Sequence, residues 1–195
     1  MMINSVDFMP QRDVLKLTPS HNTAIISIHD VGEEFEEKKI EAWGVDYKKY
    51  WGSWTSFAFE DAAYNEDMIK QYGKEFNKYF ADCFTPDMAL DMLEEIVSIT
   101  TNPQITQIIV HCDSGRSRSA AVAKFLNDKY HIPVLRDIEY PNSLVTKLLN
   151  DPACYDQTFE EYVHEPVVEA KIDKPTGNND LITKLSKILT AIFGK

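Results

Sequence analysis

Short runs of apolar and β-branched residues alternate with longer helical patterns, and this alternation limits the possible folds more than any other feature of the chain. Three such runs lie at residues 23–28, 55–59 and 107–110. Their apolar positions are continuous rather than alternating, which is typical of strands buried on both faces of a sheet. Residues 14–17 are expected to form a further strand.

Helical patterns fill the intervals between these runs. Thr85 is a suitable N-cap, and Pro86 suits the first position of the helix that follows. Four helices are expected, at residues 66–80, from 86 to about 97, from just after Gly115 to about 130, and after Pro141 to about 149. Strands alternating with helices predict an α/β fold with a central, mostly parallel sheet flanked by helices.

The domain organisation follows from a change in composition near residue 165. Residues 1–164 are expected to form one domain, and residues 165–179, with two prolines, a glycine and two asparagines, a linker. Residues 180–195 are expected to form a C-terminal helix with an apolar stripe. That stripe is expected to pack against the domain, and the alternatives are a homodimer through this helix or contact with a membrane surface.

Composition restricts the function. The formal net charge of -11 disfavours a nucleic-acid partner, although a local anion site is compatible with an acidic protein. The three cysteines, Cys83, Cys112 and Cys154, suggest no disulfide framework and favour a reducing compartment. We find no apolar stretch of the roughly 20 residues that a transmembrane helix needs and no signal-peptide pattern, so a soluble cytoplasmic protein is expected.

The segment with the clearest chemical meaning follows the strand at 107–110 and leads into a helix. It reads Val110-His111-Cys112-Asp113-Ser114-Gly115-Arg116-Ser117-Arg118-Ser119. A loop in this position directs backbone N–H groups toward one point at the positive end of a helix dipole, which favours anion binding. Gly115 allows the backbone to approach the anion closely.

Within this loop, Cys112 is the candidate nucleophile, because the same N–H groups and dipole stabilise a thiolate. Arg118 has a planar guanidinium that can hold two oxygens of a phosphoryl group. Ser119 is expected to donate a hydrogen bond to the cysteine sulfur, and His111 to support the loop from below. The alternative for Cys112 is a buried structural thiol.

The pattern His-Cys-x-x-Gly-x-x-Arg-Ser resembles the signature of the protein tyrosine phosphatase superfamily in its compact, dual-specificity-like form, and the likeness covers roughly residues 5–150. Residues 23–32, 57–61 and 140–149 resemble further segments of a bacterial and phage branch. The resemblance implies a dual-specificity-phosphatase-like fold, a phosphate-binding loop of Asp113, Ser114, Gly115, Arg116, Ser117 and Arg118, and a phosphocysteine intermediate. It implies no metal or organic cofactor, and a phosphorylated protein or small phosphoester as substrate.

The resemblance also implies an aspartate after a strand that acts as general acid. Asp61, which follows the strand at 55–59, is the candidate, and Glu60, Asp67 and Asp82 are the alternatives. The interval between Asp61 and Cys112 is longer than dual-specificity enzymes usually have. We interpret the excess as an inserted helix at 66–80 that is able to cap the site.

Two features bear on the substrate. Arg116 lies inside the loop, where lipid and inositide phosphatases carry a basic residue. The loop sequence also resembles that of the phosphatidylglycerophosphate phosphatase. The alternative for Arg116 is an ion pair with Asp113 or another acidic residue. An aromatic cluster of Trp43, Tyr47, Tyr50, Trp51 and Trp54 is either a wall for a phosphotyrosine ring or part of the core. The expected function is a tyrosine or dual-specificity protein phosphatase. The alternatives are a lipid or inositide phosphatase and a phospho-ligand binding protein with weak turnover.

Overall fold

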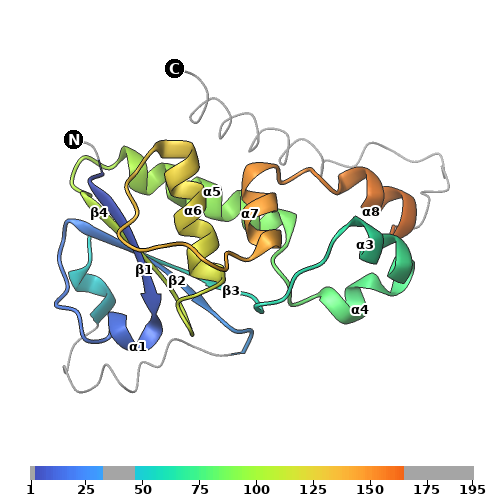
Figure 1. The fold of residues 1–195 in the computed structure, drawn as a ribbon, viewed down its shortest axis with the longest axis horizontal. Coiled ribbons are helices and arrows are strands. Elements are labelled where there is room, and N and C mark those ends of the chain that lie inside the picture. The colour runs from blue at the N-terminus through green and yellow to red at the C-terminus, as the bar shows by residue number, and fades with distance from the viewer. Residues whose placement is uncertain (1–2, 33–46, 165–195) are drawn as a thin grey trace, which may run out of the picture.

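A computed structural model describes residues 3–32 and 47–164 (Figure 1). It contains a four-stranded, all-parallel sheet in the order β1-β4-β2-β3. The strands are β1 (Ser5–Pro10), β2 (Thr23–His29), β3 (Ser53–Ala58) and β4 (Gln107–Cys112). The expected α/β fold with a parallel sheet flanked by helices is confirmed.

Both faces of the sheet are buried at β2 and β4, as the continuous apolar runs predict. The prediction is wrong for β3, because this strand lies at the edge of the sheet and its residues are only partly buried or exposed. Successive residues of one strand serve the two faces in turn: Ile108 belongs to the larger hydrophobic cluster, and Ile109 belongs to the smaller one. The larger cluster contains residues of α5 (Pro86–Thr101), α6 (Arg118–Tyr130) and α7 (Ser143–Asn150). The smaller cluster contains residues of α1 (Gln11–Val14) and η2 (Tyr47–Tyr50).

The strand expected at residues 14–17 is wrong, and the strand at the chain's start was missed. Residues 11–14 form α1, and Ser5–Pro10 form β1, which pairs with β4 in parallel. Val14 is fully buried, but it belongs to a single helical turn and not to a strand. Asp7 interrupts the apolar pattern of β1, but it lies at the sheet margin and pairs with Arg136, so the strand tolerates it.

The helix expected at residues 66–80 is divided into three pieces. They are α3 (Glu66–Tyr72), the 3-10 helix η3 (Gly73–Glu75) and α4 (Phe76–Phe80). Gly73 has φ 48, a left-handed conformation that ends α3. Together with α8 (Asp156–Tyr162), which the sequence analysis did not foresee, these pieces form a lobe beside the sheet (Figure 1).

The expected helix at 86–97 is confirmed and is longer. Thr85 is its N-cap and accepts a hydrogen bond from the Met88 N–H at 3.2 Å. The linker at 165–179 and the C-terminal helix at 180–195, with the homodimer proposed for it, lie outside the described residues. Across residues 3–32 and 47–164, no helix has the length and apolar character needed to cross a membrane.

Candidate active site

The cysteine loop, residues 112–118, lies at the carboxyl edge of the sheet. β4 runs between β1 and β2, and Cys112 is its last residue, opposite Pro10 of β1. Gly115 in the loop has φ 67. A Cβ atom at Gly115 would lie 2.2 Å from the backbone nitrogen of Pro10, so the loop rests directly on the end of β1. Only glycine combines this conformation with this approach.

The structure brings Cys112 and Ser119 together. Both side chains are fully buried, and the sulfur of Cys112 lies 3.3 Å from the hydroxyl oxygen of Ser119. A hydroxyl at this distance can donate a hydrogen bond to a thiolate. Burial raises the pKa of the Cys83 and Cys154 thiols, and neither residue belongs to such a loop.

His111 precedes Cys112 and lies beneath the loop, inside the sheet. Burial, and to a smaller extent the nearby His29, lowers the pKa of His111 to about 3. The Trp54 ring packs against it with 6.0 Å between ring centroids. The imidazole is therefore neutral near pH 7, which fits a supporting role rather than proton transfer.

Arg118 is the first residue of α6, and its guanidinium is anchored at one end. Its Nη1 donates to the carbonyl oxygen of Phe59 at 2.5 Å and forms an ion pair with Asp30 Oδ1, also at 2.5 Å. The side chain is almost completely buried, and its Nε–H is a buried donor with no acceptor among the described residues. An unsatisfied buried donor is costly, and an anion bound by the loop would satisfy it.

Asp30 was not foreseen as a site residue. It follows β2, and Asp61 follows β3, so the two carboxylates leave neighbouring parallel strands at the edge where β4 ends. An acidic residue directly after a buried strand was the available signal. The Asp30–Arg118 ion pair shows that its carboxylate supports the arginine.

The structure also brings Asp61 to the cysteine loop, despite the long interval between them. Asp61 Oδ1 accepts hydrogen bonds from the Ser117 hydroxyl at 2.7 Å and from the Asn142 side-chain amide at 2.9 Å. The backbone N–H of Asn142 donates to the Ser117 carbonyl at 3.1 Å. Asn142 also caps α7 through Oδ1, so one residue links the acid, the loop and that helix.

The alternative acids are not placed in this way. Within the described residues, the side chains of Glu60, Asp67 and Asp82 form no hydrogen bond or ion pair with the loop. Asp67 lies in the first turn of α3, and the segment containing it packs against α8. The inserted segment, residues 66–80, lies in the lobe beside the sheet, which we call the lateral lobe (α3, η3, α4 and α8), rather than above the cysteine loop (Figure 1).

Arg116, Asp113 and Ser114 are the exposed residues of the loop. The pairing of Arg116 with Asp113 is not found, and no carboxylate among the described residues forms an ion pair with Arg116. Its guanidinium carbon instead lies 5.2 Å from the centroid of the Tyr140 ring, which is itself 61% exposed. Among the described residues, the Arg116 side chain has only this aromatic contact, so it is available to an anionic group of a ligand in addition to the anion that the loop would bind.

Part of the aromatic cluster at residues 43–54 belongs to the core. Tyr47 and Trp51 are buried in the smaller hydrophobic cluster, and the Tyr47 hydroxyl donates to the carbonyls of Val14 and Leu17, each at 2.9 Å. Tyr50 is exposed, and Trp43 lies outside the described residues. This arrangement favours the core interpretation over a wall for a substrate ring.

No family model matches the chain, and neither the curated proteins nor the solved structures contain a significant match to it.

Proposed function

We propose that this protein is a cysteine-dependent phosphomonoesterase of the tyrosine or dual-specificity type, with a dual-specificity-phosphatase-like fold. The observation that carries the proposal is the arrangement around the cysteine loop. A buried thiol with a hydroxyl 3.3 Å away shares this loop with a buried arginine whose Nε–H has no acceptor in residues 3–32 and 47–164. Asp61 is hydrogen-bonded to the same loop.

In the first step, the Cys112 thiolate attacks phosphorus and forms the S–P bond. The bond from phosphorus to the leaving oxygen breaks, and its electron pair stays on that oxygen, which takes a proton from Asp61. Arg118 and the backbone N–H groups of the loop stabilise the charge on the transferring phosphoryl group. The anchored Nη1 supports this role, because it limits the rotation of the guanidinium.

In the second step, water attacks phosphorus and gives its proton to the Asp61 carboxylate. The S–P bond breaks, inorganic phosphate forms, and the thiolate returns. A hydrogen bond from Ser119 stabilises the departing thiolate, in agreement with the short distance between its oxygen and the sulfur.

The test is hydrolysis of p-nitrophenyl phosphate and of a phosphotyrosine peptide by the full chain. We expect the Cys112→Ser variant to stay folded and to lose more than about 99% of the turnover, because the loss of an essential nucleophile raises the barrier by several kcal/mol. A residual rate above that level would refute the assignment of the nucleophile.

The acid is tested with Asp61→Asn, which keeps an oxygen that can accept from Ser117 and Asn142. Hydrolysis of the phosphotyrosine peptide should slow by roughly 10²–10⁴, and hydrolysis of p-nitrophenyl phosphate much less, since its leaving group needs little protonation. Asp67→Asn serves as the matched control and should leave both rates unchanged. The reverse pattern would identify Asp67 as the acid.

A second candidate, a phosphatase for inositides, phosphatidylglycerophosphate or a related polyanionic lipid, is favoured by Arg116. This exposed guanidinium has no carboxylate partner among the described residues and lies in the loop itself. If it binds a second anionic group, Arg116→Ala should reduce kcat/KM for a bisphosphorylated inositide by ten-fold or more while changing that for p-nitrophenyl phosphate less than about two-fold. Equal effects on both substrates would exclude this candidate.

A further inference from the structure

The lateral lobe contains a groove that is separate from the cysteine loop. A cavity of about 630 Å³ lies between α4, the start of α5 and α8. Its volume is in the range that accommodates a drug-sized ligand or a few residues of a peptide. None of the residues proposed for phosphoryl transfer lines it.

The floor of the groove is aromatic. Tyr64 and Phe76 are buried at its base, with ring centroids 4.9 Å apart, and Phe159 packs on Phe76 at 5.2 Å. Phe80 is partly buried and completes the floor. Because these rings come from α4, from α8 and from the segment before α3 and hold one another in place, the floor is preformed.

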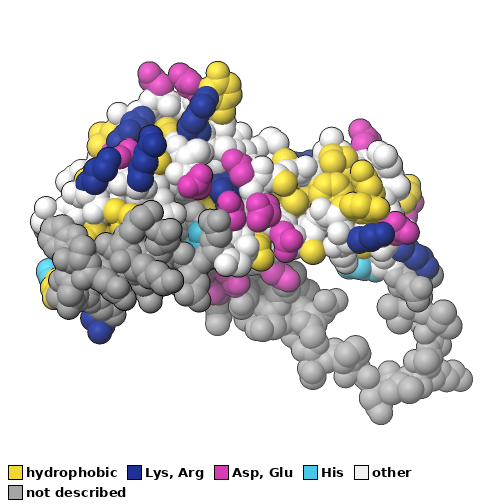
Figure 2. All heavy atoms as spheres, turned by 90° about the horizontal axis from the view of Figure 1, so that it is seen from below, with side chains coloured by type: hydrophobic (Ala, Val, Ile, Leu, Met, Phe, Trp, Pro, Cys, Tyr) yellow, Lys and Arg dark blue, Asp and Glu magenta, His cyan; other side chains and the backbone are white. Residues whose placement is uncertain are grey.

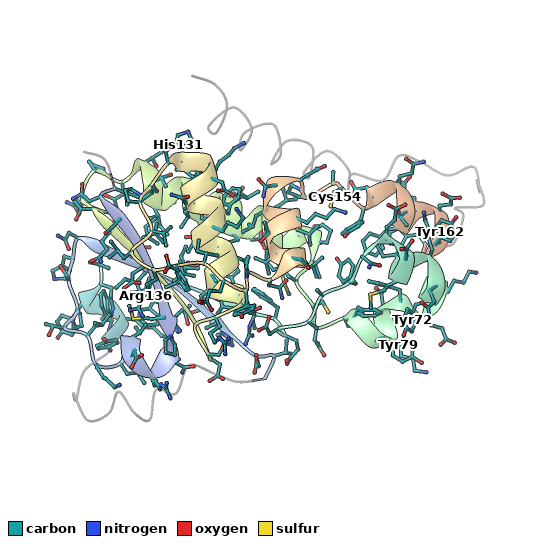
Figure 3. The ribbon with its side chains drawn as sticks, viewed as in Figure 1. Tyr72, Tyr79, His131, Arg136, Cys154 and Tyr162 are labelled. Atoms are coloured by element: carbon teal, nitrogen blue, oxygen red, sulfur yellow. The ribbon has the colours of Figure 1, made fainter. Side chains whose placement is uncertain are left out.

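The same lobe also carries exposed apolar surface that does not line the groove. Tyr79, next to Phe80, is 54% exposed, and its ring lies 5.0 Å from that of Tyr72 (Figure 3). Figure 2 shows hydrophobic side chains gathered on this part of the molecule, with both basic and acidic side chains beside them.

The sides of the groove are acidic. Asp87 lies in the first turn of α5, and Asp156 and Glu160 are four residues apart on α8, so they share one face of that helix. Burial, followed by the neighbouring Glu160, Asp151 and Asp87, raises the pKa of Asp156. No lysine or arginine among the described residues forms an ion pair with these three carboxylates.

We propose that this groove docks a short peptide segment of a protein partner in which an arginine or lysine stands beside an aromatic or aliphatic residue. The apolar side chain packs on the Phe80 and Phe159 rings, and the cation is attracted both by those rings and by Asp156 and Glu160. This complementarity of charge excludes an acidic segment. The inference does not depend on phosphatase activity.

The probes are two fluorescein-labelled pentapeptides, Phe-Arg-Leu-Arg-Gly and Phe-Glu-Leu-Glu-Gly, titrated into the full chain and followed by fluorescence anisotropy. The basic peptide should bind at least ten-fold more tightly than the acidic one. Its affinity should fall as salt is added, because the ion pairs are near the surface.

Glu160→Gln and Glu161→Gln form a matched pair of variants. The two glutamates are adjacent and exposed on α8, but only Glu160 lines the groove. We expect Glu160→Gln to weaken the basic peptide about three- to five-fold, the range of one partly screened ion pair, and Glu161→Gln less than two-fold. Absence of binding, equal binding of both peptides or equal effects of the two variants would overturn the proposal.

Discussion

Replacing Gly115 with alanine separates the conformational requirement of the cysteine loop from its chemistry. The substitution adds one methyl group and removes no polar atom. In the structure, that methyl carbon would lie 2.2 Å from the nitrogen of Pro10 and 2.3 Å from the carbonyl carbon of Met9. Both are backbone atoms of β1, which is held in register against β4. The strand cannot move away without breaking sheet hydrogen bonds, so the loop must move.

The expected cost has two parts. An alanine at φ 67 costs about 1–2 kcal/mol in backbone strain. Overpacking against a fixed neighbour adds about 1–3 kcal/mol. A total of about 2–5 kcal/mol corresponds, for a chain of this size, to a fall of roughly 5–15 °C in Tm. Because the loop must shift by about 1 Å, turnover should fall by about 10² or more.

Gly32→Ala is the matched control. Gly32 also has positive φ, 83, but a Cβ atom there would meet no atom of the described residues within 4 Å. We therefore expect only the strain, about 1–2 kcal/mol, and little change in turnover. Thermal denaturation followed by circular dichroism measures stability, and p-nitrophenyl phosphate hydrolysis measures turnover. If Gly115→Ala and Gly32→Ala change Tm and turnover equally, the argument from the contact with β1 is refuted.

Two further predictions concern the charges around the loop. Because the pKa of His111 is lowered to about 3, the folded protein keeps this residue neutral, while the unfolded chain takes up a proton near pH 6.5. The contribution of the neutral imidazole to stability is therefore complete above pH 6.5 and is lost as pH falls toward 3. About 1.4 kcal/mol of the free energy of unfolding is lost between pH 7.5 and 5.5. Urea denaturation at these two pH values should show a pH dependence weaker by that amount in His111→Asn, and parallel dependences would contradict the burial argument. Asp30→Asn should lower the free energy of unfolding by about 2 kcal/mol, because it leaves the buried Arg118 without its carboxylate. Asp7→Asn is the control: it breaks the more exposed ion pair with Arg136 and should lower the free energy of unfolding by less than about 1 kcal/mol. Equal losses in the two variants would show that the Asp30 pair is a surface contact.

Several parts of the fold were predictable because their causes are local. Three consecutive apolar residues at 108–110 indicate burial on both faces, and the structure places Ile108 and Ile109 in different hydrophobic clusters. Thr85 and Pro86 mark the start of α5 through capping. The glycine in the cysteine loop reflects a backbone conformation that few other residues adopt. Each of these signals lies within a few residues of the feature it predicts.

Other parts depended on tertiary structure. The lobe of α3, α4 and α8 exists because Phe76 and Phe159, far apart in the chain, pack together, and no local pattern specifies that contact. Periodicity indicates that a segment is buried, but it does not indicate which segment covers it.

By itself, the sequence determined that a cysteine and an arginine share one strand-loop-helix unit, because both belong to the same short segment and the turn requires glycine. Only the tertiary structure decided which carboxylates complete the site. Asp30 pairs with Arg118 and Asp61 bonds to Ser117 because β2 and β3 run parallel to β4 and end at the same edge of the sheet. The order of strands in a sheet is a property of long-range packing, so the residues around Asp30 and Asp61 indicate candidate carboxylates but not the groups that they contact.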